Sequence, residues 1–473
     1  MNHLGFAFNR IRKEFIEIAY SEARPGISPV ENVLIPVTRY PGAYVSETNI
    51  GVRRLSIPII IYHEGYEDLQ KKKEEIAEWL YHEEPKELVF DDEPEQIYYA
   101  KFDGELNFEE HRTVAFSTLE FICPDPFKYG PEKVVEPSSD TFIVENEGTA
   151  PTKPIFELTA KEPVTFAMIS DGERYNMIGR PADVDEQVVP RKTTLLDERG
   201  DTIDQWDVAP GSTGSFVQGS LGIQVQSYGT GTGWHGPRLI TEIDPTEDFE
   251  IEFYVNVRSE TPERTFRIST NYYDENMNEL GMLRLWDNSD RILRKVVEAR
   301  VGPYVGDFIN YPISSRNYDL RTQRVWNGLI RVTRINNIYF FYVARITQTG
   351  RHVDTLSTAF PDVNKEFAGP LKFVRIDIAK YGDTPPPNEV GITRIKVSKH
   401  HQVLVDQTPY IADVGDIFTF DHSTNELLLN GEDVKSMKDF GGEYFDLPKG
   451  YTALTILPEG AFDTKVRFRP RYK

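Results

Sequence analysis

The sequence has very little cysteine and no long apolar segment. Its single cysteine, Cys123, excludes an internal disulfide framework and a zinc site built on several thiolates. No apolar run reaches the roughly 18 residues that a membrane-spanning helix needs, and no basic-then-apolar leader is present, so we expect neither a membrane span nor a secretory signal. Positive charge is also scarce: 53 Lys and Arg stand against 75 Asp and Glu. Because phosphate neutralisation supplies most nucleic-acid affinity, we expect no sequence-specific nucleic-acid binding.

Motifs that organise catalytic or metal sites are missing as well. There is no GxSxG elbow, no P-loop and no HExxH segment, and the nine histidines show no metal-ligand spacing. Carboxylate pairs occur, as in any acidic protein, but no motif assigns them to glycoside hydrolysis. We therefore expect no catalytic residues, no metal and no cofactor, and we predict that the protein is not an enzyme.

Aromatic residues are abundant, and short strand patterns follow one another along the chain. The 473 residues correspond to about three domains at roughly 150 residues each, and 24 Tyr with 28 Phe indicate folded cores. Apolar residues at helical spacing predict one helix over 67–84. The strand patterns around it predict a compact α+β domain over residues 1–130.

The middle of the chain differs from its two flanks in charge. Residues 191–400 contain 26 Lys and Arg against 27 Asp and Glu, whereas the rest of the chain contains 27 against 48. Alternating strands such as 249–257 and 371–378, and a tight turn at Asn336-Asn337, favour a two-sheet β-sandwich for this block. The flanks 131–190 and 401–473 are each too short for a sandwich. Together they reach an ordinary size, so the sequence predicts a mainly β protein in which 191–400 is inserted into a discontinuous β-sandwich.

Aromatic residues in the inserted block are candidates for carbohydrate binding. The glycine-rich loop 229–237 carries Trp234 and His235, and a ring on an exposed loop can stack against the apolar C–H face of a sugar. Core packing is the alternative for each ring, and it is favoured for Trp286 and Trp326. The full set of candidates comprises Trp234, His235, Tyr272, Tyr273, Trp286, Asp287 and Tyr311.

Four segments at the two ends of the chain are characteristic in combination. They are DPFKYG at 125–130, VENEGTAPTKP at 144–154, LLLNG at 427–431 and FDLPKG at 445–450. In this order they resemble the distal tail (Dit) proteins of siphophages, over roughly residues 1–190 and 401–473. The extra 210 residues at 191–400 resemble the evolved members of that family, which carry an insert similar to a carbohydrate-binding module.

The resemblance implies an architecture and a set of partners. The N-terminal domain would form a homo-hexameric ring, the discontinuous domain would be a galectin-like β-sandwich, and the insert would have a jelly-roll fold. The protein would be the hub that joins the tail tube protein, the tail-associated lysin or tail fibre protein, and the receptor-binding proteins. It would lie in the tail tip or baseplate of the virion, after assembly in the host cytoplasm, with no membrane contact.

Three functions remain for the insert at this point. It would bind host cell-wall polysaccharide during adsorption, serve as the catalytic domain of a tail-borne depolymerase or glycosidase, or dock other baseplate proteins. A close pair of carboxylates in a groove beside Trp234 would favour the enzyme, whereas an aromatic shelf without such a pair would favour binding.

Overall fold

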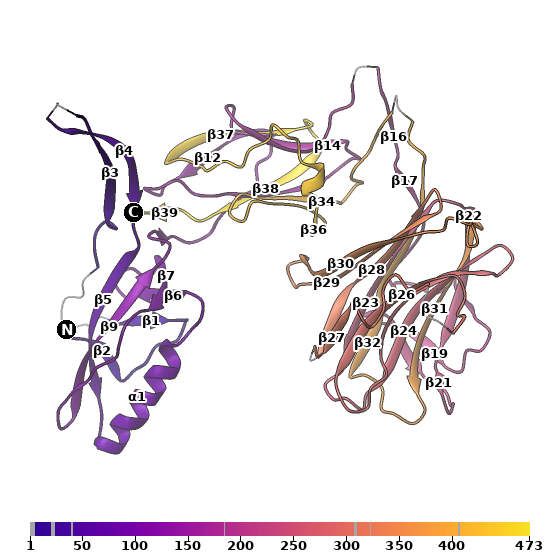
Figure 1. Ribbon diagram of the computed structural model, residues 1–473, viewed down its shortest axis with the longest axis horizontal. Coiled ribbons are helices and arrows are strands. Elements are labelled where there is room, and N and C mark those ends of the chain that lie inside the picture. The colour runs from indigo at the N-terminus through magenta and orange to yellow at the C-terminus, as the bar shows by residue number, and fades with distance from the viewer. Residues whose placement is uncertain are drawn as a thin grey trace.

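The protein consists of three bodies, each with its own apolar core. The computed structural model describes residues 5–19, 24–38, 41–183, 185–306, 310–321, 323–404 and 407–473. Within them the buried apolar side chains form three separate clusters, one in each body of Figure 1. Sheets build all three bodies, so the prediction of a mainly β protein is confirmed. Among the described residues, no helix is both long enough and apolar enough to cross a membrane.

The N-terminal body is a nine-stranded sheet that packs on helix α1 (Tyr66–Leu80). The main strand order is β1–β6–β7–β9–β5–β2. The helix buries Leu69, Ile76 and Trp79 on one face, and the Trp79 indole N–H donates to the Phe8 carbonyl at 3.0 Å. The strands of this sheet are β1 (Phe6–Phe8), β2 (Ile16–Ile18), β5 (Arg53–Tyr62), β6 (Lys86–Phe90), β7 (Ile97–Phe102), β8 (Glu109–Glu110), β9 (Val114–Cys123), β10 (Lys128–Tyr129) and, from the C-terminus, β39 (Arg471–Tyr472).

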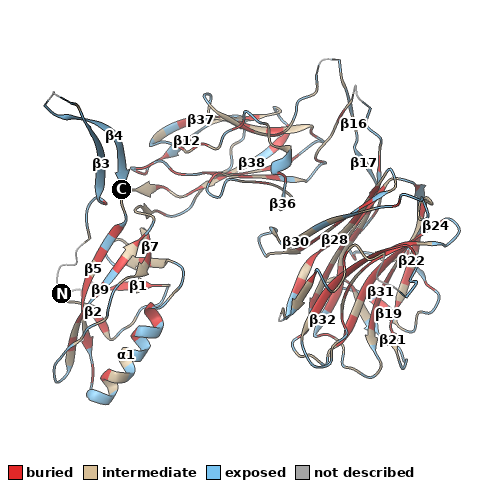
Figure 2. Cartoon of the chain, viewed as in Figure 1, coloured by how far each residue is buried: buried red, intermediate tan, exposed pale blue. Residues whose placement is uncertain are grey.

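A two-stranded hairpin extends away from this body. Strands β3 (Val30–Pro36) and β4 (Ala43–Ile50) pair only with each other among the described residues, and every residue of both is exposed. Figures 1 and 2 show the hairpin projecting past the C-terminus of the chain with no covering element. A two-stranded ribbon without a packed face is marginally stable by itself, so this hairpin has an incomplete environment within one chain.

The second body is a β-sandwich made from two distant parts of the sequence, which we call the split sandwich. Its two sheets have the strand orders β11–β38–β13–β34–β35–β36 and β12–β37–β14–β15. Every strand of the early part pairs with the late part except β15, which pairs with β14. The early strands are β11 (Lys133–Val135), β12 (Thr141–Asn146), β13 (Ile155–Ala160), β14 (Phe166–Ser170) and β15 (Tyr175–Gly179); the late strands are β34 (Ile417–Asp421), β35 (Glu426–Leu429), β36 (Glu432–Asp433), β37 (Gly450–Leu457) and β38 (Phe462–Phe468).

The C-terminal strand fastens the split sandwich to the N-terminal body. Strand β39 (Arg471–Tyr472) pairs with β10, which also pairs with β7 of the N-terminal sheet. The Arg471 guanidinium lies 4.1 Å from the Phe127 ring centroid, and the Arg471 carbonyl accepts the Ala150 N–H at 3.0 Å. The two bodies are therefore joined by sheet hydrogen bonds as well as by the chain connection.

The third body, which we call the insert, is a sandwich of two eight-stranded sheets. The chain leaves the split sandwich through β16 (Gln187–Val189) and returns through β33 (Gln407–Pro409), which pair in parallel. The first sheet holds β17 (Lys192–Glu198), β19 (Ser215–Gly219), β20 (Gly222–Ser227), β23 (Phe249–Arg258), β28 (Val325–Ile335), β29 (Ile338–Ile346), β30 (His352–Pro361) and β32 (Glu389–His400). The second holds β18 (Asp207–Val208), β21 (Trp234–His235), β22 (Arg238–Thr246), β24 (Phe266–Asp274), β25 (Glu279–Asp287), β26 (Arg294–Val301), β27 (Asp319–Arg321) and β31 (Leu371–Tyr381).

Candidate binding site in the insert

A pocket of about 450 Å³, which we call the outer pocket, lies on the second sheet of the insert, on the face opposite the core. Strand alternation explains its composition, because successive side chains point to opposite faces. In β24, Ile268 enters the core, whereas Arg267, Ser269 and Asn271 line the pocket. The segment after β26 supplies a further wall that includes Tyr311.

Four arginines line the outer pocket, and three of them have carboxylate partners. Arg300 donates to Glu279 at 2.8 Å, Arg284 forms an ion pair with Glu298, and Arg267 lies 3.9 Å from Asp377. The fourth, Arg375, places its guanidinium 5.4 Å from the Tyr273 ring centroid.

The arginines are close enough to repel one another. Burial lowers the pKa of the Arg267 guanidinium, and neighbouring positive charges lower it further, whereas Asp377 raises it. The neighbouring positive charges are those of Arg284, Arg238 and Arg375. The pocket is therefore a site of concentrated positive charge in a chain whose net charge is −22.

Aromatic rings continue from the pocket to its edge. Trp286 lines the pocket, and its ring centroid lies 6.4 Å from that of Trp234, which in turn lies 5.5 Å from that of Tyr381. Arginines contact both indoles: Arg284 is 4.6 Å from the Trp286 ring and Arg267 is 5.3 Å from the Trp234 ring. These contacts hold the two indoles beside the charged groups.

The structure brings four of the seven predicted residues to this region. Tyr273, Trp286 and Tyr311 line the outer pocket, and Trp234 contacts Trp286. Strand β21 explains the position of Trp234, because Trp234 pairs with Tyr381 at the end of β31. The pocket arginines were absent from the sequence-based set. The signal that could have found them is the polar side chain at every second position of β24 from Arg267 to Asn271, together with Arg375 and Asp377 in β31.

The other three predicted residues do not lie in the pocket. Tyr272 is completely buried between the two sheets, so its prediction as a ligand contact is wrong. His235 is buried, with its Nδ1 atom 2.9 Å from the Gly233 carbonyl oxygen. Asp287 is buried and accepts the backbone N–H groups of Ser289 at 3.0 Å and Arg294 at 2.7 Å. His235 and Asp287 therefore contact local backbone and do not line the outer pocket.

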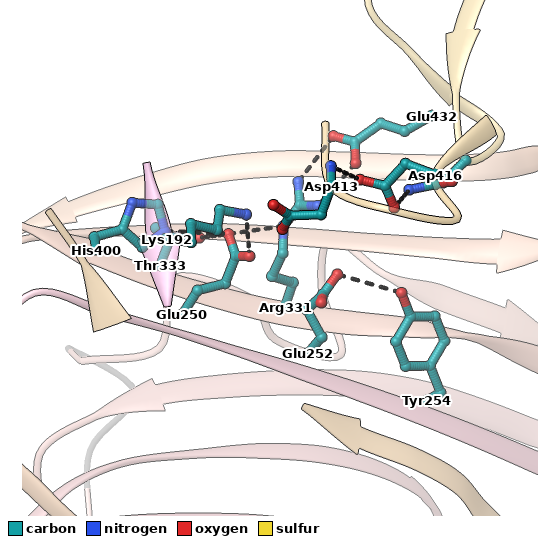
Figure 3. A network of polar contacts seen from close by, with 11 residues as sticks. Lys192, Glu250, Glu252, Tyr254, Arg331, Thr333, His400, Asp413, Asp416 and Glu432 are labelled. Carbon is teal, nitrogen blue, oxygen red and sulfur yellow. Dashed lines mark hydrogen bonds and ion pairs between the residues drawn. The ribbon is translucent and has the colours of Figure 1, made fainter. Parts of the chain in front are cut away.

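A second pocket, of about 520 Å³, lies between the insert and the split sandwich. Figure 3 shows the polar network along it. Arg331 of the insert donates two hydrogen bonds of 2.8 Å to Glu432 of the split sandwich. Beside it, Glu250 accepts the Thr333 hydroxyl at 2.8 Å and forms an ion pair with Lys192. This network fixes the insert against β36 by a bidentate arginine–carboxylate contact.

The charges around Glu250 determine its protonation. Burial would raise the pKa of Glu250, but the His400 ring, whose Nε2 atom lies 3.7 Å from the carboxylate, and the positive charges of Lys192 and Arg331 outweigh that effect and hold the pKa low. Burial and the charge of Glu250 raise the pKa of the neighbouring Glu252. In the described part of the chain, no group of three or more His, Cys, Asp or Glu side chains could hold a metal ion.

Comparisons with known proteins match both ends of the chain. Residues 16–123 match the family model of the phage tail protein RIFT-related domain, and residues 384–472 match that of the siphovirus-type tail component, C-terminal domain. A curated relative, the distal tail protein of Bacillus phage SPP1, is 29% identical over 126 residues. That match covers 26% of this chain and 50% of the relative, so the chain spans about half the length of the curated protein that it matches.

Two solved structures are also similar. The crystal structure of the phage SPP1 Dit protein aligns with 99% of this chain and 99% of its own length, at 10% identity and a TM-score of 0.44. The CBM2 module of the evolved Dit of Lactobacillus casei BL23 phage J-1 aligns over 46% of this chain and 100% of its own length, at 14% identity and a TM-score of 0.38. Residues 16–123 and 384–472 therefore match domains of phage tail proteins, and the chain is similar to the siphophage distal tail proteins.

Proposed function

We propose that the protein is the hub of the phage tail tip, that six copies form a ring through residues 1–130, and that the insert binds host cell-surface carbohydrate during adsorption. The observation that carries the binding role is the outer pocket, where an aromatic wall adjoins hydrogen-bonding side chains on an accessible face of the insert. The ring would contact the tail tube protein, the tail-associated lysin or tail fibre protein, and the receptor-binding proteins.

The side chains of the outer pocket suit a sugar chemically. The indole of Trp286 offers an apolar face for the C–H groups of a pyranose ring, and Trp234 with Tyr381 extends that face beyond the pocket. Ser269 and Asn271 supply neutral hydrogen-bonding groups for hydroxyls. This combination of a stacking surface and a few polar groups is typical of small-ligand sites.

The hairpin β3–β4 supports self-assembly. Leu34 and Val45 are paired across the two strands, and their side chains are 57% and 58% exposed. Exposed apolar residues that gather on one element indicate an interaction surface. A neighbouring copy would cover this hairpin and complete its environment.

One experiment on the full-length protein distinguishes carbohydrate binding from catalysis: it measures both retention on polysaccharides and release of sugar. We expect retention of the protein on an array of bacterial surface polysaccharides, with no sugar released. Trp286→Ala should weaken retention by on the order of 1–3 kcal/mol if the ring is a central anchor. Trp326→Phe, a change in the insert core, is the control for folding.

Release of sugar from the array would instead favour a tail-borne carbohydrate-active enzyme. In that case Glu279 and Asp377, the two carboxylates that line the outer pocket, would be the first residues to substitute. Absence of both retention and release would contradict the carbohydrate role and leave docking of another baseplate protein as the function of the insert.

A further inference from the structure

The outer pocket has more positive charge than its own carboxylates neutralise. Three of its arginines have carboxylate partners, but among the described residues the side chain of Arg375 has no ion pair or hydrogen bond and only stacks on Tyr273. An arginine side chain stays protonated in a protein, so this charge cannot be removed by loss of a proton.

Several donors in the same pocket also lack acceptors. The Nε–H groups of Arg375 and Arg284 and the indole N–H of Trp286 are buried and form no hydrogen bond within the described part of the protein. All three side chains line the outer pocket. Buried donors are almost always paired, so these three groups favour a ligand that supplies acceptors. The Oδ2 atom of Asp377 in the same lining is an unpaired acceptor, so the donors outnumber the unpaired acceptors by three to one among these buried atoms.

We propose that the outer pocket binds an acidic saccharide, one that bears a carboxylate or phosphate group, with Arg375 as the anion contact and Trp286 as the stacking surface. The proposal rests on the carbohydrate-binding function stated above and specifies its ligand class. A planar guanidinium can donate two parallel hydrogen bonds to a carboxylate or phosphate, which a hydroxyl group cannot match in charge.

The negative net charge of the protein makes a preference for acidic saccharides easy to recognise in a binding experiment. A chain of −22 repels polyanions in general, so binding to an acidic polymer requires a local positive site. Arg291 is a matched control, because it belongs to the loop after β25 and its side chain is 91% exposed, outside the pocket lining.

The experiment uses the full-length protein and two pairs of polysaccharides that differ only in charge. Polygalacturonate is compared with its methyl ester, and phosphomannan is compared with dephosphorylated mannan; the two pairs distinguish a carboxylate from a phosphate. We expect the acidic member of at least one pair to bind at least tenfold more tightly than its uncharged partner. Arg375→Gln should remove this difference, whereas Arg291→Gln should preserve it, with the thermal unfolding of both variants unchanged.

Three results would overturn the proposal. Equal binding of charged and uncharged members in both pairs would reject the acidic ligand while leaving carbohydrate binding intact. An Arg375→Gln effect no larger than that of Arg291→Gln would reject Arg375 as the anion contact. Failure to bind any of the four polymers, together with no retention on the wider polysaccharide array, would overturn the carbohydrate function itself.

Discussion

At the scale of single residues, substitution of the buried charged side chains should have the largest effect on stability. Glu250 is buried between Lys192, Arg331 and His400, and its carboxylate is stabilised only because these groups surround it. Removing one member of a buried charge group leaves the others uncompensated. The network between the insert and the split sandwich is therefore sensitive to substitution of this one carboxylate.

Glu250→Gln is expected to lower the free energy of unfolding by on the order of 3 kcal/mol at pH 7. The folded-state pKa of Glu250 lies below its ordinary value of 4.5, so its ionic stabilisation is complete above about pH 4.5 and is lost as the pH falls through the folded-state pKa. The difference between wild type and variant should therefore shrink below pH 4.5 in urea unfolding curves. The exposed Glu275→Gln should show a small difference at every pH; a pH-independent Glu250→Gln effect would contradict the charge argument.

The face of the strand to which each side chain points explains which site residues the sequence could predict. Phe266–Asp274 contains adjacent Tyr272 and Tyr273, and only one of them can point to the core. A shift in register between these two residues makes the local alternation irregular. The sequence pattern alone therefore could not decide that Tyr272 is buried and that Tyr273 reaches the pocket. The pocket itself also depends on pairing of β24 with β31, which lies far from the β24–β25 hairpin in the sequence.

At the scale of elements, the sequence patterns predicted the type of secondary structure but not which strands are buried. The helix predicted over 67–84 exists as α1, but it ends at Leu80 because the backbone of Tyr81 is extended. Asn336 and Asn337 both have positive φ and connect β28 to β29, which confirms the predicted tight turn. Strand β3 contains the apolar residues Val33, Leu34 and Ile35, yet its side chains enter no core.

The exposed hairpin leads to a prediction about assembly. Leu34→Thr with Val45→Thr keeps residues suited to strands but removes the apolar surface, so the ring should dissociate to smaller species in light scattering. Because the hairpin contributes nothing to the N-terminal core, the thermal unfolding of each subunit should change little. Val363→Thr, at an exposed apolar position of the insert, should leave assembly intact. A ring that survives the double substitution would assign assembly to another surface.

At the scale of the whole molecule, the chain enters and leaves the insert at a single narrow point. The His401 N–H donates to the Arg191 carbonyl at 3.0 Å, and Lys192 pairs with His400 as the first rung between β17 and β32. The two cores share no residue. The bidentate contact between Arg331 and Glu432 adds a second point of attachment.

Deleting residues 192–400 and joining Arg191 to His401 through Asn-Gly should therefore leave a folded protein that still forms a ring. The two-residue turn suits the short distance between the ends. We expect an unchanged number of subunits in the ring and complete loss of polysaccharide retention. Retention by the shortened chain would place the carbohydrate site outside the insert, and aggregation would show that the split sandwich depends on it.

The adjacent entry and exit of the insert also affect how such tails can diversify. Two genetic crossovers, one on each side of the connection, would exchange the whole insert while every strand pair of the split sandwich stays the same. A different insert could thus be acquired without any change in the body that supports it. The geometry at Arg191 and His401 makes this exchange a matter of joining two points already one hydrogen bond apart.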